Sequence, residues 1–506
     1  MEVIISYLYT SLSLLLLLFL SYKFYLSKTT YKNLPPSPPS SLPILGHLHL
    51  LKPPIHRFLQ SLSQKYGPII SLKFGHRIVV VVSSPSAVEE CFTKNDIVLA
   101  NRPQFTLSKH INYNCNDIIS VPYGDHWRNL RRIGTLEIFS TNRLNEFTST
   151  RKDEIKRLLI ELSRHSKQDF AEVELKSRFS NLTFNVILRM VAGKRYYGDD
   201  ANNKEEAKEF RELIGEIFRN GGASHPEDFL PILSWINGGK LEKTAKGLAK
   251  RSNKFLQGLI DEHRHRKEGS EITDTMIDHL LSLQGSEPNV YTDDVIKGLI
   301  MIMLLAGTDT SSVTLEWAMS NLVNHPDTLN KAKIELDAII GQEHLLEESD
   351  LSKLPYLHNI ISETLRLYPS APLLVPHFTS DDCTIGGYNV PRGTIVLVNA
   401  WAIHRDSSVW DDPISFKPER FEQGQTEAYK YLPFGLGRRA CPGATMAQRV
   451  VGLTLGSLIQ CFEWRRIDEK LVDMTEGIGI SMPKAEPLKV MCKSRDIMNK
   501  VLIETS

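Results

Sequence analysis

The sequence contains few cysteines and carries almost no net charge. Six cysteines are spread over 506 residues and no two form a CxxC pair, which argues against a disulfide framework and a zinc ribbon. Lys and Arg total 60 against 59 Asp and Glu, so the formal charge is +1 and the broad basic surface that nucleic-acid binding needs is missing. We therefore expect reduced thiols and no nucleic-acid partner.

The chain also lacks an internal repeat of fixed period, so one large domain is simpler than several. Amphipathic runs at 140–162, 204–218 and 241–262 predict helices, and residues 69–84 predict two short strands that meet at Gly75 and His76. Further on, Gly386-Gly387 predicts a hairpin turn and Val396–Val398 a core strand. The expected fold class is mainly α with smaller β-sheet regions.

One long apolar run stands at the start of the chain, at residues 4–20, and Lys23, Lys28 and Lys32 follow it. About 20 apolar residues span a bilayer, and lysines after the span place the rest of the chain in the cytosol. A cleaved secretory signal is the alternative, but the charge follows the run and no A-x-A-like cleavage site is present. We predict an N-terminal transmembrane helix.

This reading divides the chain into a membrane anchor at 1–27, a basic and proline-rich linker at 28–46, and one domain at 47–506. Closely spaced prolines fix φ and make the linker stiff. The pattern Asn181-Leu182-Thr183 matches an N-glycosylation acceptor, and a cytosolic domain predicts that it stays unmodified.

Near the C-terminus, "PFGLGRRACPG" places one cysteine among glycines and arginines. Taken alone, such a cysteine is most often a small buried residue. Its frame is more specific, because five positions form F-x-x-G-x-R-x-C-x-G: Phe434, Gly437, Arg439, Cys441 and Gly443. This frame resembles the cytochrome P450 superfamily, in which the cysteine thiolate is the proximal ligand of haem iron.

The resemblance implies a role for each position of this loop. Cys441 is then the metal ligand, Arg439 meets a haem propionate, and Phe434 belongs to the cofactor site. Gly437 and Gly443 let backbone N–H groups approach the sulfur and stabilise the thiolate.

The run from Leu299 to Pro326 predicts a long buried helix that Thr292-Asp293 could cap, yet small and hydroxylated residues interrupt its middle at 307–311. One explanation is a structural kink, with Thr310 bonded to a carbonyl one turn earlier. The resemblance implies another, in which Asp309 and Thr310 deliver protons to bound dioxygen and Gly307 leaves space over the iron.

Glu363 and Arg366 share one helix face in "ISETLRLYP", and "PERF" offers Arg420 as a third member. An arbitrary pair of this kind is an ordinary surface salt bridge of little value. The resemblance implies instead a buried Glu-Arg-Arg network that supports the haem site.

"HWRNLRR" places Trp127 and Arg131 at i, i+4 spacing, and the resemblance assigns both, with His377, to the haem propionates. The alternatives are a packed aromatic, a solvated charge and a structural histidine. The neighbouring cations Arg128 and Arg132, with Arg438, form a candidate docking patch for an acidic flavoprotein reductase.

The resemblance covers nearly the whole chain in the family's order, and "NDIVLANRP" and "YGDHWRNLRR" are most similar to plant microsomal members, in particular the (iso)flavonoid and lignan oxidases. It implies haem b, O2, and NADPH electrons passed through NADPH-cytochrome P450 reductase. The haem-thiolate catalytic domain would then lie in the cytosol, held by a single-pass anchor in the endoplasmic reticulum membrane.

The implied reaction is insertion of one oxygen atom into an apolar or aromatic plant metabolite of flavonoid, isoflavonoid or lignan type. The same haem chemistry could instead close a methylenedioxy ring or remove a methyl group. A reductase-independent haem isomerase or dehydratase and a non-catalytic haem protein are the rivals. Substrate-contacting segments are expected at 105–119, 300–306, 371–375 and 476–480.

Overall fold

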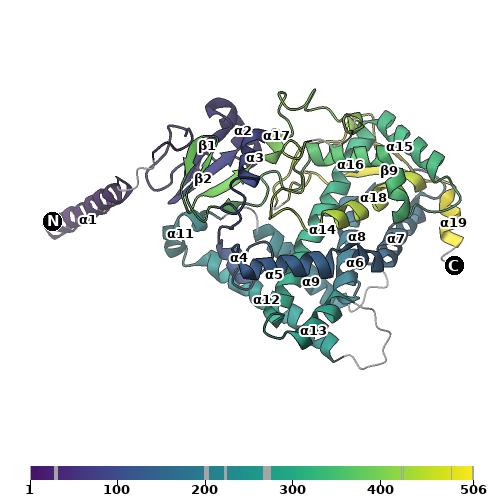
Figure 1. Ribbon diagram of the computed structural model, residues 1–506, viewed down its shortest axis with the longest axis horizontal. Helices are drawn as coiled ribbons and strands as arrows, with labels where there is room; N and C mark the ends of the chain where they lie inside the picture. Colours follow the sequence, from purple (N-terminus) through teal and green to yellow (C-terminus); the bar gives the residue numbers. More distant parts are fainter. Residues whose placement is uncertain are drawn as a thin grey trace.

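The computed structural model describes residues 2–27, 32–198, 204–220, 225–265, 275–422, 424, 427–479 and 481–503. Lys28 and Ile480, both named in the sequence analysis, lie outside this part. Within it, helices dominate and the strands form three small sheets, which confirms the expected fold class (Figure 1).

The α-helices are α1 Glu2–Ser27, α2 Ile55–Tyr66, α3 Pro85–Phe92, α4 Thr106–Ile111, α5 Asp125–Ile133, α6 Thr141–Glu146, α7 Thr148–Ser166, α8 Lys176–Ala192, α9 Lys204–Asn220, α10 Pro226–Phe229, α11 Pro231–Ile236, α12 Lys240–Arg264, α13 Met276–Ser286, α14 Asp293–Asn324, α15 Pro326–Ile339, α16 Pro355–Leu367, α17 Ala400–Ile403, α18 Ala444–Cys461 and α19 Ile497–Ile503. Short helical turns are η1 Leu48–Leu50, η2 Gly134–Ile138, η3 Glu348–Lys353 and η4 Pro418–Phe421. The strands are β1 Ile69–Phe74, β2 Arg77–Val82, β3 Ala171–Glu174, β4 His377–Phe378, β5 Cys383–Ile385, β6 Tyr388–Val390, β7 Ile395–Val398, β8 Phe462–Arg465 and β9 Lys489–Ser494.

The largest sheet has the order β1-β2-β7-β4 and joins an early hairpin to strands from the last third of the chain. The turn at Gly75 is confirmed, because β1 and β2 pair antiparallel on either side of it and Gly75 has a φ of +57°. The predicted core strand is β7, which runs parallel to β2. Gly386 and Gly387 join β5 to β6 with φ values of +58° and +80°, a conformation that favours glycine.

The predicted run at 140–162 differs from the structure, which divides it into α6 and α7 at Phe147. Amphipathic spacing continues across this point, so periodicity alone does not reveal the break. The other two runs correspond to α9 and α12.

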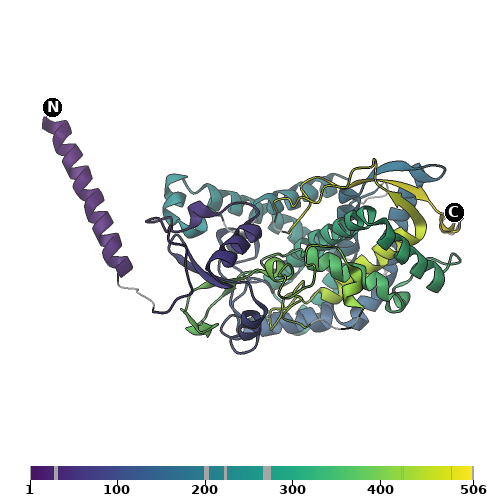
Figure 2. The same cartoon turned by 90° about the horizontal axis from the view of Figure 1, so that it is seen from above.

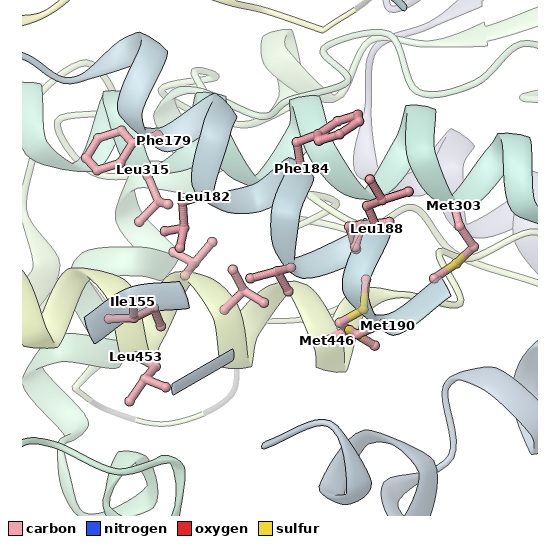
Figure 3. Packing of buried hydrophobic residues seen from close by; sticks show 14 of the residues in the cluster. Ile155, Phe179, Leu182, Phe184, Leu188, Met190, Met303, Leu315, Met446 and Leu453 are labelled. Carbon is pink, nitrogen blue, oxygen red and sulfur yellow. The ribbon is translucent and has the colours of Figure 1, made fainter. Parts of the chain in front are cut away.

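Helix α14 is 32 residues long and forms the centre of the molecule. The hydroxyl of Thr292 caps it by accepting a hydrogen bond from the Val295 N–H at 3.4 Å, as the sequence suggested. Helices α8 and α18 pack along it, and Figure 3 shows Leu315 and Met303 of α14 in the apolar core between these helices. The helix continues without interruption through 307–311.

Gly307 allows the close packing of α8 on α14. A Cβ at this position would lie 2.9 Å from Cδ1 of Ile187 on α8. The glycine therefore prevents a steric clash between two helices. The expected role of leaving space over the iron stays a prediction.

Helix α1 stands away from the rest of the protein (Figures 1 and 2). Its segment Ile5–Tyr22 has a mean hydropathy of 1.7 and no buried residue, whereas 67% of the apolar window in α14 is buried inside the protein. Helix α1 thus has the length, composition and exposure of a membrane anchor, while α14 is a core helix. The division at 1–27, 28–46 and 47–506 stays a prediction.

Candidate active site

A cavity of about 1660 Å³, its mouth included, lies against α14, α5 and the loop that carries Cys441. Most of its wall is aliphatic, with contributions from Ile118, Ile302, Met303, Ala306 and Leu374. Such a wall excludes water and accommodates an apolar molecule. Cys441 also lines the cavity, and its side chain is exposed there.

The loop of Cys441 is closed by its own backbone. The Cys441 N–H donates to the Phe434 carbonyl at 2.9 Å, and helix α18 begins three residues after the cysteine. The Cys441 side chain is open to the cavity but lies deep inside the protein, and this position raises the pKa of its thiol, while the Gly443 N–H and the charge of Arg131 act in the opposite direction. A donor, a cation and a helix N-terminus therefore all favour the thiolate at this position.

The structure supports the expected role for Gly443 but gives a different one for Gly437. Gly437 has a φ of +69°, and a Cβ there would lie 2.4 Å from a carboxylate oxygen of Asp96. The residue must be glycine because of its backbone conformation and this close approach, independently of the sulfur.

Four basic side chains line one cavity: Arg102, Arg131, Arg439 and His377. Burial lowers the pKa of Arg439 to about 10 and that of Arg102 to about 9, and each cation is further disfavoured by a neighbouring arginine. Asp117 is the carboxylate whose charge opposes this effect. The wall therefore carries an excess of positive charge that is at least partly shielded from solvent, which favours an anionic ligand.

Arg439 links two distant parts of the chain. Its guanidinium donates to the carbonyls of Ala100, Ile118 and Val121 at 2.7, 3.1 and 2.5 Å, and it lies 4.7 Å from the ring centroid of Trp127. The indole N–H of Trp127 donates to the Ile118 carbonyl at 3.2 Å. These contacts fix the segment around 100–121 against the cysteine loop.

Arg131 reaches the cysteine loop from α5. Its Nη1 donates to the carbonyl of Ala440 at 2.7 Å, next to Cys441. Trp127 and Arg131 thus line the same cavity from one helix face, as their spacing predicts.

Arg102 is a cavity cation that the sequence analysis missed. Its Nη1 donates to the Val375 and Pro376 carbonyls at 2.8 and 2.9 Å, and its Nε is buried with no hydrogen-bond partner among the described residues. The residue lies within "NDIVLANRP", which was noted only for its similarity to plant proteins. This similarity was the one feature of the sequence that pointed to Arg102.

His377 lies in the cavity wall, buried on β4. Its Nδ1 lies 2.8 Å from the Leu99 carbonyl, which only accepts hydrogen bonds, so Nδ1 carries a proton. Burial and the charge of Arg102 lower the pKa of His377 well below its usual value. The neutral ring therefore presents Nε2 as an acceptor, and donation to a propionate from Nε2 requires the protonated form.

Asp309 and Thr310 are neighbours on α14, but only Thr310 lines the cavity. The Thr310 hydroxyl donates to the Ala306 carbonyl at 2.7 Å, the bond expected for the structural alternative, although the helix does not break. The Asp309 carboxylate instead accepts a hydrogen bond from Ser481. Burial raises the pKa of Asp309.

Glu363, Arg366 and Arg420 form one network. Arg366 makes two bonds to the Glu363 carboxylate, at 2.6 and 2.8 Å, and Arg420 Nε donates to the same carboxylate at 3.0 Å. The side chains of Glu363 and Arg366 are fully buried. The pair is therefore a buried network and not a surface salt bridge.

The network also fixes the segment that leads to the cysteine loop. Arg366 Nη1 donates to the carbonyls of His404 and Pro413 at 2.5 and 2.7 Å. His404, another residue the sequence analysis missed, pairs with the Arg366 carbonyl through Nδ1 at 3.0 Å and accepts the Leu432 N–H on Nε2 at 2.8 Å. Leu432 stands just before Pro433, where the cysteine loop begins.

The expected surface patch is assembled in part. The guanidinium carbons of Arg128 and Arg438 lie 5.6 and 5.7 Å from the ring centroid of Tyr123, so these two cations are neighbours. Each also pairs with a carboxylate, Asp125 and Asp96 respectively. Arg132, one helical turn from Arg128, bonds to Asn129.

The expected substrate segments contribute unequally to the cavity. Ile118 and Ile119 come from 105–119, Ala306 from 300–306, and Leu374 from 371–375. The described residues of 476–480 are absent from the wall, and Glu476 is turned into a separate buried cluster with His56 and Arg57.

A thiol and three arginines that line one apolar cavity are the features of a protein that holds an anionic cofactor beside a hydrophobic substrate. The comparisons with known proteins agree with this class. The family described as cytochrome P450 matches residues 35–490. The chain belongs to the cytochrome P450 family, and is therefore a monooxygenase of the oxidoreductase class that uses haem, O2 and a small-molecule substrate.

Relatives of known activity match along their whole length. The chain is 54% identical to a (+)-piperitol/(+)-sesamin synthase of Sesamum radiatum, with 99% of each chain covered. It is 56% identical to an isoflavone 3'-hydroxylase of Medicago truncatula, covering 97% of this chain and 99% of the relative. A zebra fish cytochrome P450 solved with progesterone superposes with a TM-score of 0.75 at 27% identity, covering 87% of this chain and all of the other.

The residues of the cavity fit haem. Haem carries two propionates, and the wall offers three arginines. Arg102 is buried, and its Nε has no hydrogen-bond partner in the described part of the chain. Its iron requires an axial ligand, and the Cys441 side chain is exposed to the same cavity.

Proposed function

We propose that the Cys441 thiolate ligates the iron of haem b in this cavity. Arg102, Arg131 and Arg439 balance the propionates, and Trp127 orients Arg439 by stacking. The support is the arrangement itself, because one thiol and three arginines from three chain segments line a single space. His377 adds a further donor when it is protonated.

Haem with a thiolate ligand supplies dioxygen activation and the insertion of one oxygen atom. The chain's own residues supply protons and a dry site. Thr310 lines the cavity, and in our proposal the adjacent Asp309 passes protons to its hydroxyl. The aliphatic wall excludes water and holds the apolar substrate.

The substrates we propose are apolar or aromatic plant specialised metabolites of flavonoid, isoflavonoid or lignan type. The aliphatic cavity accommodates such molecules, and the relatives named above act on isoflavones and lignans. Hydroxylation is the first candidate reaction. Closure of a methylenedioxy ring is the second, favoured by the 54% identity to the (+)-piperitol/(+)-sesamin synthase.

Electrons come from NADPH through a membrane-bound reductase, in our proposal. Arg128 and Arg438 are about half exposed, and both lie beside the ring of Tyr123. Arg128 belongs to α5, the helix that also carries Arg131, and Arg438 belongs to the loop of Cys441. Cations at this place suit an acidic flavoprotein surface, and the attraction weakens as salt increases.

The protein is held, in our proposal, at the endoplasmic reticulum membrane by a single pass of α1, with the catalytic domain in the cytosol. Exposed apolar side chains support this pose: Trp235 is 84% exposed on α11, and Ile44 in the linker is 52% exposed. Figure 2 shows α11 on the side of the molecule from which α1 extends.

Two measurements on full-length protein test the proposal. The ferrous protein with carbon monoxide should show the red-shifted Soret band of thiolate-bound haem, which Cys441→Ser abolishes and Cys383→Ser preserves. Microsomes with a reductase and NADPH should then convert flavonoid, isoflavone or lignan probes, with gain of one oxygen for hydroxylation and loss of two hydrogens for ring closure. Absence of the Soret band in the parent contradicts the assignment of Cys441.

A further inference from the structure

Asp309 faces a different part of the protein from Thr310. Consecutive residues of an α-helix point about 100° apart, so two neighbours cannot both face one cavity squarely. Thr310 lines the cavity, while the Asp309 carboxylate accepts a hydrogen bond from the Ser481 hydroxyl. Ser481 is itself buried, with 8% of its surface exposed.

The segment that carries Ser481 is bonded to α14 and to the loop that follows α16. The Met482 N–H donates to the Ser370 carbonyl at 3.0 Å, and the indole N–H of Trp317 donates to the Met482 carbonyl at 2.8 Å. Trp317 is fully buried on α14 and stacks on Tyr368 with ring centroids 4.0 Å apart. The residue that follows Ser481 is therefore bonded on both its N–H and its carbonyl, which fixes the backbone next to the Ser481 hydroxyl.

The same junction also supports Thr310. The hydroxyl of Ser370 donates to the Thr310 carbonyl at 3.2 Å, and the hydroxyl of Thr314 donates to the same carbonyl at 2.8 Å. One loop junction thus holds the backbone of Thr310 through Ser370 and the carboxylate of Asp309 through Ser481.

The surroundings of Asp309 act on its proton in opposite directions. Burial raises its pKa, whereas the Ser481 hydrogen bond and the charge of Lys176, at the start of α8, lower it. Within the described chain, no other side chain donates a hydrogen bond to this carboxylate.

Other charges face α14 farther along the helix. Glu316, two turns on, feels the charges of Lys176, Lys484 and Glu174. Of this group only Lys176 acts on both carboxylates. Ser481 is therefore the contact that distinguishes Asp309 from the other buried acid of the helix.

We propose that Ser481 is a positioning residue for proton delivery, whose hydroxyl holds the Asp309 carboxylate beside α14 between deliveries. The inference rests on the proposed role of Asp309 and Thr310. A proton that reaches Asp309 neutralises it, which weakens its charge-assisted bond to Ser481 and frees the acid to turn. Asp309 then gives its proton to the Thr310 oxygen, while the Thr310 proton leaves its bond to the Ala306 carbonyl and enters the cavity. The carboxylate returns to Ser481.

The test is the titration of the Asp309 carboxyl in full-length holoenzyme. Infrared difference spectroscopy measures it through the carboxyl band of Asp309, and Asp309→Asn, which lacks this band, is the reference. Ser481→Ala should raise the apparent pKa of Asp309 by about one unit, because the carboxylate loses one charge-assisted hydrogen bond. Ser481→Thr, which keeps the hydroxyl, should restore the parent value.

Ser312→Ala is the matched control. The Ser312 hydroxyl donates to the backbone carbonyl of Asp309 at 3.0 Å. This variant therefore removes a serine hydrogen bond to the backbone of Asp309 and leaves the bond to its carboxylate in place. The control should leave the titration unchanged. An unchanged titration in Ser481→Ala, with the Soret band of thiolate-bound haem intact, overturns the proposal.

A second readout separates this proposal from the proposed function. NADPH consumption and peroxide release are measured as a function of pH. The part of this pH profile that Asp309→Asn abolishes should shift to higher pH in Ser481→Ala. If Asp309→Asn leaves peroxide release per NADPH unchanged, the proton-delivery role of Asp309 fails, and Ser481→Ala with a shifted carboxyl band is then a structural contact only.

Discussion

At the scale of single residues, Arg102 is the most buried of the three arginines that line the cavity. It is 7% exposed and its Nε has no hydrogen-bond partner in the described part of the chain. Leaving one member of a buried ion pair uncompensated destabilises by about 3–5 kcal/mol. The haem propionates supply the missing anion in the structure we propose.

We therefore predict that Arg102→Leu lowers haem retention at least several-fold, with Arg102→Lys in between. The measurement is haem per folded protein after gel filtration, with the fold checked by circular dichroism. The parent should also prefer haem over its dimethyl ester, and Arg102→Leu should lose much of that preference because the ester has no propionate charge.

Arg128→Leu is the control for this prediction, since Arg128 lies on α5 close to the site but its side chain is 55% exposed. It should retain haem like the parent. Equal haem retention by Arg102→Leu and Arg128→Leu would show that Arg102 does not pair with a propionate.

The sequence foresaw those site residues whose neighbours are local. The cysteine loop and the Trp127/Arg131 spacing lie within short segments, and both line the cavity as expected. Arg102 was missed because its partners, the carbonyls of Val375 and Pro376, lie more than 270 residues away. Helix spacing shows that Asp309 and Thr310 diverge, but only the packed neighbours decide which one faces the cavity.

At the scale of elements, the Glu363 network joins α16 to η4 and to the chain before the cysteine loop. We predict that Glu363→Ala lowers the free energy of unfolding by about 3–5 kcal/mol, because two arginines lose their shared carboxylate in a buried place. Haem incorporation should fall with it, since His404 and Leu432 lose their support. Thermal unfolding and haem content measure the two effects.

Glu161→Ala provides the surface comparison. Glu161 pairs with Arg178 across two helices, but its side chain is 54% exposed. Removing it should change stability by less than about 1 kcal/mol and leave haem content unchanged. Normal haem content in Glu363→Ala would contradict the prediction.

A second junction of elements centres on Glu476, whose side chain is 1% exposed. Its carboxylate bonds to His56 at 2.7 Å, to Arg57 at 2.8 and 3.0 Å, and to the Trp401 indole at 3.0 Å. The C-terminal loop is thereby tied to α2 and α17. Burial alone would raise the pKa of Glu476, but the bonds from His56 and Arg57 lower it to about 2.

This lowered pKa makes the junction sensitive to acid. A carboxylate with a depressed folded pKa stabilises the protein above its unfolded pKa, near 4.5, and the contribution is lost as pH falls toward about 2. The contribution at neutral pH is on the order of 3 kcal/mol. Glu476→Gln should thus be less stable than the parent at pH 7, and the difference should shrink on acidification to about pH 3.

Thermal unfolding between pH 3 and pH 7 measures this difference. Glu343→Gln is the control, because Glu343 pairs with Lys500 at the surface with its side chain 87% exposed, and it should follow the parent at every pH. A stability gap between Glu476→Gln and the parent that stays constant with pH would contradict the assignment.

Long-range contacts also mark the limit of sequence reasoning for elements. The strands β1 and β2 were foreseen because their pattern and turn are local. The substrate role expected for 476–480 failed for Glu476, because its acidic side chain finds His56 and Trp401 in distant segments. The residues next to Glu476 in the sequence do not indicate that its side chain is buried, because its partners lie far away along the chain.

At the scale of the whole molecule, the orientation of α1 in a membrane would set the side on which the catalytic domain lies. Helix α1 extends from the side of the protein that carries α11 and the linker (Figures 1 and 2). Lysines follow its apolar span, which favours a lumenal N-terminus and a cytosolic domain. The Asn181 acceptor lies in α8, far from α1 along the chain, and reports on the same question.

We predict that an N-terminal extension with an Asn-x-Thr acceptor is glycosylated in microsomes, while Asn181 is not. Protease added to intact microsomes should remove a C-terminal tag, because the tag follows a cytosolic domain. A chain that lacks residues 1–27 but carries the same extension serves as the control, and the extension should then stay unmodified. A glycan on Asn181, or a tag protected until detergent is added, would reverse the orientation and place the cavity away from a cytosolic reductase.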